Sequence, residues 1–335
     1  MSTAAVDALL AANPFPGLRA FRPAESDRFF GRQQQIDELV DLLSAARFIA
    51  VSGASGCGKS SLVLAGLLQA LKQRHEVDFE TDWRPVVMRP GHRPISHLAA
   101  ELAAALPSAQ LPSTPLREQD GTRWLSGAEA KAQGTVPSTP LRAQDGAVDD
   151  PALQRYQTLY GQLRLGGLGL AEAVRNARLP AGARVLVVVD QFEELFRFRR
   201  IASQADPDEA AAFVKLLLQA AADPAGLVSV IITLRSDTLG SCADFRDLPE
   251  AVSRGGYLVP RLKREQRKEA IVRPVELRGA RIAPRLVQRL LNDVSDDFDD
   301  LPVMQHALSR TWQQWAQTTG GSRPIDLEDY LATGG

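Results

Sequence analysis

The chain has few cysteines, no bias of charge and no long hydrophobic run. Its 335 residues include two cysteines, and the 39 Lys and Arg residues nearly balance the 40 Asp and Glu residues. Two thiols exclude a disulfide-stabilised class, and balanced charge gives no electrostatic reason to expect nucleic acid. No apolar run approaches the roughly 18 residues of a membrane-spanning helix, and the first residues lack a secretory signal pattern. We therefore expect a cytoplasmic protein without a membrane or nucleic-acid partner.

A glycine-rich segment follows an apolar stretch near residue 50. Residues 53–60 read Gly-Ala-Ser-Gly-Cys-Gly-Lys-Ser and fit the pattern G-x-x-x-x-G-K-[ST]. Glycines in this pattern let backbone N–H groups surround phosphate oxygens at a helix start. A glycine-rich helix cap is the alternative, but the preceding strand and the following amphipathic stretch favour a phosphate loop. The predicted phosphate-binding residues are Gly53, Ser55, Gly56, Cys57, Gly58, Lys59, Ser60 and Ser61.

Two of these residues have specific expected roles. The Lys59 ammonium is expected to reach the β- and γ-phosphates, and the Ser60 hydroxyl is a predicted ligand of Mg²⁺. The second expected metal residue is Asp190, which follows the apolar run Val185 to Val189. Such a run suits a central parallel strand buried on both faces, and its carboxyl end is where a metal-binding carboxylate belongs.

The residues after Asp190 supply candidates for a general base. Glu193 and Glu194 lie one turn further on, where a carboxylate can orient and deprotonate an attacking water. The sequence does not decide between them. Acidic residues also favour helix starts for electrostatic reasons alone, which is the alternative interpretation.

An arginine follows another predicted strand. Residues 227–233, which read Leu-Val-Ser-Val-Ile-Ile-Thr, are predicted to form this strand, and Arg235 comes two positions after it. Ligands of open parallel sheets lie beyond the carboxyl ends of the strands, so Arg235 is a candidate sensor of the γ-phosphate. A solvated arginine is the alternative.

The order of motifs along the chain resembles that of the bacterial STAND NTPases, and within them the group called novel STAND NTPase 1. The motifs are residues 13–18 (Asn-Pro-Phe-Pro-Gly-Leu), 29–32 (Phe-Phe-Gly-Arg), 53–60, 190–196, 234–237 and 301–308 (Leu-Pro-Val-Met-Gln-His-Ala-Leu). The resemblance implies an AAA-like core at residues 1–262 and a helical lid domain at 263–335. It also implies that the chain stops before any winged helix or sensor repeats.

The same resemblance implies further site residues and a function. Gly31 and Arg32 are expected beside the adenine, and Pro302 is expected to close over the nucleotide from the other side. The implied ligands are ATP or ADP with Mg²⁺, and the implied function is a signalling switch. Its sensor and effector partners are unidentified, and nucleotide-dependent homo-oligomerisation stays open.

The pattern of elements predicts the fold class. Strands alternate with helices from residue 47 to residue 233, which indicates an α/β protein with a parallel, doubly wound sheet of the P-loop NTPase type. Helices predicted at 266–272, 284–294 and 302–315 form the small helical domain. Residues 107–150, rich in Pro, Ser, Thr, Gln and Gly, are expected to be a flexible insertion.

The functional expectation is an ATP-binding switch module that hydrolyses ATP slowly. One alternative is a nucleotide-binding switch or scaffold without useful hydrolysis, and another is a motor or loader ATPase of AAA type. The base is expected to be adenine, because no Lys-x-Asp sequence of the kind that reads guanine in many GTPases is present.

Overall fold

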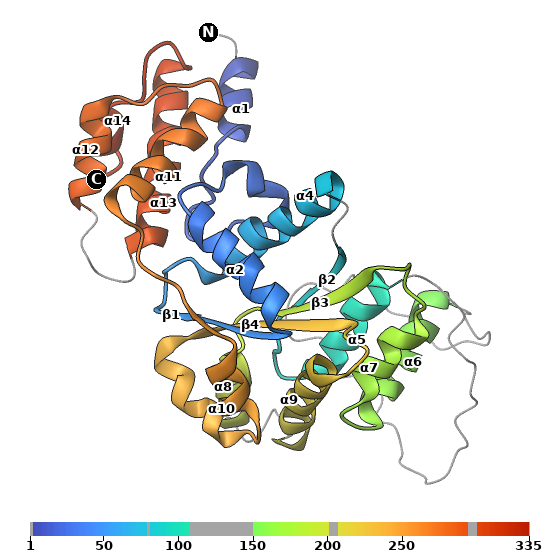
Figure 1. The fold of residues 1–335 in the computed structure, drawn as a ribbon. Coiled ribbons are helices and arrows are strands. Elements are labelled where there is room, and N and C mark those ends of the chain that lie inside the picture. Colours follow the sequence, from blue (N-terminus) through green and yellow to red (C-terminus); the bar gives the residue numbers. More distant parts are fainter. Residues whose placement is uncertain (1–2, 79–80, 107–149, 201–206, 294–299, 335) are drawn as a thin grey trace, which may run out of the picture.

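The computed structural model describes residues 3–78, 81–106, 150–200, 207–293 and 300–334. Figure 1 shows an α/β core, with a helical lobe of C-terminal segments on one side of it. Residues 107–149 of the predicted insertion lie outside the described residues.

The described residues form a sheet of five parallel strands in the order β2-β3-β4-β1-β5. The predicted parallel α/β fold is therefore confirmed. The order places β4 between β1 and β3, so the segments that follow these three strands meet at one edge of the sheet. The strands are β1 (Phe48–Gly53), β2 (Asp82–Met88), β3 (Ala183–Val189), β4 (Val228–Arg235) and β5 (Gly256–Leu258).

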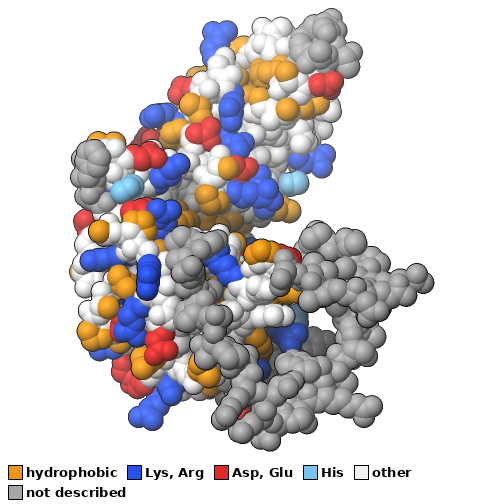
Figure 2. All heavy atoms as spheres, turned by 90° about the vertical axis from the view of Figure 1, so that its right-hand side faces the viewer, with side chains coloured by type: hydrophobic (Ala, Val, Ile, Leu, Met, Phe, Trp, Pro, Cys, Tyr) orange, Lys and Arg blue, Asp and Glu red, His pale blue; other side chains and the backbone are white. Residues whose placement is uncertain are grey.

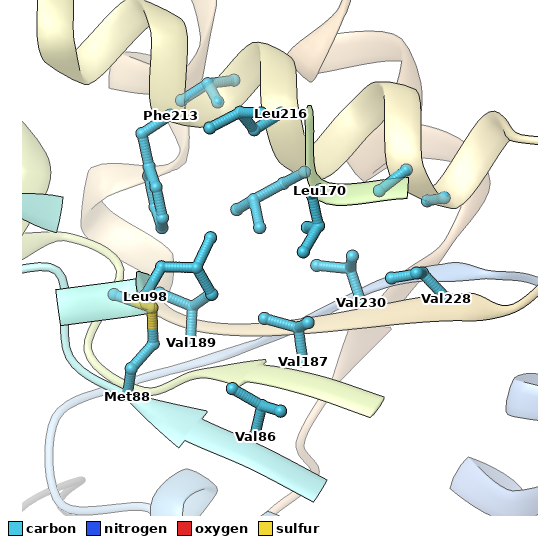
Figure 3. Packing of buried hydrophobic residues seen from close by; sticks show 14 of the residues in the cluster. Val86, Met88, Leu98, Leu170, Val187, Val189, Phe213, Leu216, Val228 and Val230 are labelled. Atoms are coloured by element: carbon cyan, nitrogen blue, oxygen red, sulfur yellow. The ribbon is translucent and has the colours of Figure 1, made fainter. Parts of the chain in front are cut away.

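The central strands are apolar throughout because both faces of the sheet are covered. In β3, Val187 and Val189 point into one hydrophobic cluster, whereas Leu186 and Val188 point into a second cluster on the opposite face. Figure 3 shows the first cluster, where Val187 and Val189 face Phe213 and other residues of the covering helices. Strand alternation thus fixes which side chains hold each helix layer.

Two helix layers cover the sheet (Figure 1). One layer contains α2 (Gln33–Ala45) and a continuous helical segment made of α3 (Lys59–Ser61), a π-helical stretch (Leu62–Leu67) and α4 (Leu68–Asp78). The other layer contains α5 (Pro94–Ala105), α6 (Pro151–Arg164), α7 (Gly169–Asn176), α8 (Glu194–Arg200), α9 (Pro207–Ala222) and α10 (Leu248–Arg254). Among the described residues, no helix is both long and apolar enough to cross a bilayer.

The helical lobe is built from α11 (Arg264–Leu277), α12 (Pro284–Asp293), α13 (Asp300–Thr319) and α14 (Leu327–Leu331) around its own apolar cluster. The first helix continues past the end expected at Val272 and holds Pro274 in its interior. Burial of Ile271 and Val275 in the lobe cluster outweighs the backbone hydrogen bond that Pro274 removes.

The N-terminal segment packs on this lobe. Helix α1 (Thr3–Ala11) lies against α13, and the Trp312 indole N–H donates to the Leu9 carbonyl at 2.8 Å. Phe15 belongs to the lobe cluster. The apolar face of the lobe thus takes up Leu9, Leu10 and Phe15.

The chain then returns to the core. We call residues 13–28 the N-terminal strap; it includes a short 3₁₀ helix, Pro23–Arg28. At its start, the Asn13 amide donates to the backbone carbonyl and the hydroxyl of Ser309 at 3.1 and 3.0 Å. Further along, the Phe21 N–H donates to the Ser61 hydroxyl at 3.1 Å. The strap therefore connects the lobe directly to the end of the glycine-rich loop.

Figure 2 shows one side of the molecule, on which basic and acidic side chains are interspersed over the described residues.

Candidate nucleotide-binding site

The glycine-rich loop lies where β1 ends, beside the end of β4. Gly53 pairs in register with Arg235, which brings the loop next to the strand that carries the candidate sensor. Gly56 and Gly58 have φ values of +72° and +92°, a left-handed conformation that favours glycine. The loop then enters the helix at Lys59, so the first N–H groups of the helix lie at the loop.

Lys59 folds back over the loop. Its ammonium donates to the carbonyls of Gly53 at 2.9 Å and Ala54 at 2.7 Å. These contacts hold the charge at the mouth of the loop, where a phosphate would be bound.

Asp190 is the centre of a polar network under the loop. It follows β3 and is 2% exposed. Its Oδ1 accepts from the Ser60 hydroxyl at 2.6 Å and from the Thr233 hydroxyl at 2.8 Å. The Thr233 hydroxyl also accepts the Gln191 N–H at 2.9 Å. These hydrogen bonds join the first turn of the helix after the glycine-rich loop to the ends of β3 and β4.

The loop after β2 contacts two carboxylates, those of Asp190 and Glu194. The Arg89 guanidinium lies 3.5 Å from Asp190 Oδ2, while 57% of the Arg89 side chain is exposed. Two residues on, the Gly91 N–H donates to Glu194 Oε2 at 3.3 Å. Asp190 thus has a cationic neighbour within the protein.

The two candidate bases differ in their surroundings. Glu194 is engaged by Gly91, whereas Glu193 lines the cavity and its Oε2 is buried with no hydrogen-bond partner among the described residues. Burial raises the pKa of the Glu193 carboxyl, and the nearby Asp190 acts in the same direction. A carboxylate with a raised pKa and a free oxygen is suited to accept a proton.

Arg235 is held at the end of β4 by an acidic neighbour. Its guanidinium donates to Asp237 Oδ1 at 3.0 Å and to Oδ2 at 2.7 Å. This contact holds the pKa of the Asp237 carboxyl below its usual value. The side chain also lines the cavity, so a phosphate there competes with Asp237 for the same donors.

Arg32 supports the loop from behind. The side chain is 3% exposed, and its guanidinium donates to the carbonyls of Cys57 at 2.9 Å and Pro260 at 2.7 Å. Burial lowers the pKa of the Arg32 guanidinium. Gly31, with φ +82°, lets α11 approach closely, because a Cβ there would lie 2.4 Å from the Gln266 carbonyl oxygen. These two residues join the phosphate loop to the start of the lobe.

A cavity of about 550 Å³ lies between the core and the lobe. The strap and Phe30 form one wall, and Leu301, Pro302, Met304 and Gln305 of α13 form another. Gly31, Gly53, Asp190 and Glu194 are not part of the lining, but they position residues that are. The sequence-predicted residues that line it are Arg32, Ser55, Gly56, Cys57, Gly58, Lys59, Ser60, Ser61, Glu193, Arg235 and Pro302.

Sequence reasoning missed several residues of this site. Thr233 could have been noticed as a hydroxyl near the carboxyl end of a mostly apolar strand, two positions before Arg235. Arg89, likewise, directly follows β2 of the same sheet. Gly17, Leu18 and Gln305 lie within the motifs at 13–18 and 301–308, but their place at the cavity depends on how the lobe folds over the core.

The glycine-rich loop at the end of β1, its lysine and serine, and the carboxylate at the end of β3 define a P-loop NTPase fold. Residues 14–335 match the family described as novel STAND NTPase 1. The chain belongs to this family and is an NTPase of the STAND class. Sequence comparison matches it to none of the curated proteins.

Solved structures show a similar fold. The ORC2 protein of Aeropyrum pernix, in ADPNP–ADP complexes, superposes with a TM-score of 0.51 at 11% identity, covering 90% of this chain and 66% of that one. Its ADP form gives a TM-score of 0.50 at 12% identity, covering 95% and 68%. The chain therefore spans about two thirds of the length of these proteins. At such identities the likeness is one of fold.

Proposed function

We propose that the chain binds ATP with Mg²⁺, hydrolyses it slowly and acts as the nucleotide-controlled switch of a signalling protein. One observation carries the proposal: the phosphate loop and Glu193 share a single cavity with Leu301 and Pro302 of the lobe. A nucleotide in this cavity touches both parts of the molecule.

The residues present fit a nucleotide and a metal ion. Gly56 and Gly58 are left-handed, and the loop leaves room for phosphate oxygens at Gly58, where a Cβ would meet only the Leu301 side chain, at 4.0 Å. The Ser60 hydroxyl and the Asp190 carboxylate are oxygen donors, which Mg²⁺ prefers. When bound, Mg²⁺ would neutralise the charge that develops on the phosphate oxygens.

The chain's own residues supply the other parts of the reaction. The free Oε2 of Glu193 is placed to orient a water molecule and take its proton. Lys59 and Arg235 contribute positive charge from two sides of the cavity. Arg235 pairs with Asp237 through an exposed contact, so its guanidinium can exchange these hydrogen bonds for phosphate oxygens at little cost.

The switch role is supported by the way the lobe is attached. The strap contacts Ser309 in the lobe and Ser61 beside the phosphate loop, and Arg32 links the loop to the segment before α11. Nucleotide binding across the cavity stabilises the closed arrangement by mass action, and loss of nucleotide releases it. Sensor and effector partners, or a second copy of the chain, would respond to this change.

The test begins with the nucleotide that co-purifies with the chain, released by denaturation and identified by chromatography. Calorimetry with ATP and ADP, with and without Mg²⁺, then measures affinity, and hydrogen exchange of residues 13–21 measures closure. We expect an adenine nucleotide, Mg²⁺-dependent affinity and slower exchange in the strap. A chain that binds no nucleotide contradicts the proposal, and binding without any change in the strap contradicts its switch part.

A further inference from the structure

One face of α13 runs along the cavity. Leu301, Gln305 and Ser309 are spaced four residues apart and therefore lie on the same face of the helix. Leu301 is next to Gly58 of the phosphate loop, and Ser309 holds Asn13 of the strap. Gln305 lies between these two contacts and lines the cavity.

Gln305 has an unsatisfied acceptor at this place. Its Oε1 is buried, and it has no hydrogen-bond partner among the described residues. Buried side-chain oxygens are normally paired, because losing water without gaining a donor is unfavourable. Because this unpaired oxygen belongs to a residue on the wall of a ligand cavity, a hydrogen-bond donor on the ligand would explain it.

The position along α13 indicates which part of the ligand supplies the donor. A helix rises by about 1.5 Å per residue, so Gln305 lies about 6 Å beyond Leu301 along the axis. Leu301 is the residue beside the phosphate loop, and Pro302 and Phe30 supply apolar surface in the same cavity. Gln305 is therefore at the distance of the base and not of the phosphates.

We infer that Gln305 is the residue that selects adenine, with its Oε1 accepting a hydrogen bond from the 6-amino group; this inference rests on the proposed nucleotide binding. The side-chain NH₂ is then free to donate to the adjacent ring nitrogen, a pairing that adenine allows. Hypoxanthine and guanine carry a carbonyl oxygen at position 6, which would face Oε1 as acceptor against acceptor. The site rejects such bases because its buried acceptor stays unpaired.

The test compares ADP with inosine diphosphate, whose base has a carbonyl oxygen where adenine has the amino group. Calorimetry on the full chain with Mg²⁺ is expected to show ADP binding about tenfold more tightly or better. In Gln305→Leu, which keeps the side-chain size, the ADP affinity falls and the ratio between the two nucleotides approaches one. The matched control is Gln313→Leu, an exposed glutamine on the same helix, which keeps the wild-type ratio.

Thermal unfolding of the nucleotide-free variants supplies an independent readout. Gln305→Leu is expected to melt no lower than wild type, because it removes an unpaired buried oxygen. A wild-type chain that binds both nucleotides equally overturns the inference without any variant, and so does an unchanged ratio in Gln305→Leu. A chain that binds neither nucleotide instead overturns the proposed function itself.

Discussion

The Ser60 hydroxyl donates a hydrogen bond of 2.6 Å to Asp190, a residue 130 positions away in the sequence. This bond joins the first turn after the phosphate loop to the end of β3. It holds the two expected metal-binding oxygens next to each other, so that a Mg²⁺ ion would contact both with little rearrangement of the chain. Thr233 fixes the same carboxylate oxygen from β4.

Replacing Asp190 by Asn should remove the charge while keeping an oxygen that can accept from Ser60 and Thr233. We expect the gain in ATP affinity on adding Mg²⁺ to fall by about tenfold or more, the equivalent of about 1.4 kcal/mol. Calorimetry with and without Mg²⁺ measures this gain. An unchanged gain would place the metal-binding carboxylate elsewhere.

Lys59→Ala should reduce ATP affinity by about a hundredfold or more, because a charge-assisted contact to phosphate is lost. The fold should persist, since the carbonyls of Gly53 and Ala54, which accept hydrogen bonds from the Lys59 ammonium, can bind water instead. Binding by calorimetry and unfolding by circular dichroism check both parts. The exposed Lys72 provides the control, as Lys72→Ala should retain full affinity.

The two glutamates should separate in their effect on hydrolysis. Glu193→Gln is expected to slow phosphate release by about a hundredfold and leave ATP affinity nearly intact, because the amide cannot take the proton of water. Glu194→Gln should have little effect, since an amide oxygen can still accept the Gly91 N–H. Phosphate release is measured against Lys59→Ala as background. Equal losses in both variants would argue against Glu193 as the base.

The pH dependence of stability provides a separate check on Glu193. Its folded-state pKa is raised above the usual 4.5, so the folded state disfavours the charged form, and stability falls as pH rises from 4.5 through the raised value. Glu193→Gln should therefore melt higher than wild type at neutral pH, and the difference should shrink as pH approaches 4.5. Melting curves across this range test it, with the exposed Glu250→Gln as control. A difference that grows on acidification would mean the opposite sign of the shift.

Arg89 should weaken metal binding, because its guanidinium lies beside Asp190 Oδ2. We expect Arg89→Gln to bind Mg²⁺ more tightly in the ATP complex, as judged by the Mg²⁺ concentration that gives half of the affinity gain. Stability should change by less than about 1 kcal/mol, since the Arg89 side chain is 57% exposed and its contact with Asp190 is long, at 3.5 Å. Arg93→Gln, exposed on the same loop, is the control. Weaker Mg²⁺ binding in Arg89→Gln would show that Arg89 contacts phosphate instead.

Much of the core could be predicted because its signals are local. The phosphate loop is a contiguous pattern in which the glycines at 56 and 58 meet a backbone requirement, and the run before Asp190 is apolar because its strand is buried on both faces. The parallel sheet followed from the alternation of strands and helices. The ends of elements were predicted less accurately. Helix α11 was expected to end at residue 272 but continues to Leu277 through Pro274, because tertiary packing outweighs the local cost of proline.

The sequence by itself determined the phosphate loop, the acidic strand end and the α/β class, since each depends on residues adjacent along the chain. Only the tertiary structure decided that Glu194 is taken up by Gly91 while Glu193 keeps a free oxygen in the cavity. It also decided that the N-terminal strap connects the lobe to Ser61 and that Gln305 faces the cavity between them. Such contacts join residues far apart in the chain. They form when apolar faces of separate segments pack together, and the spacing of neighbouring residues does not predict that packing.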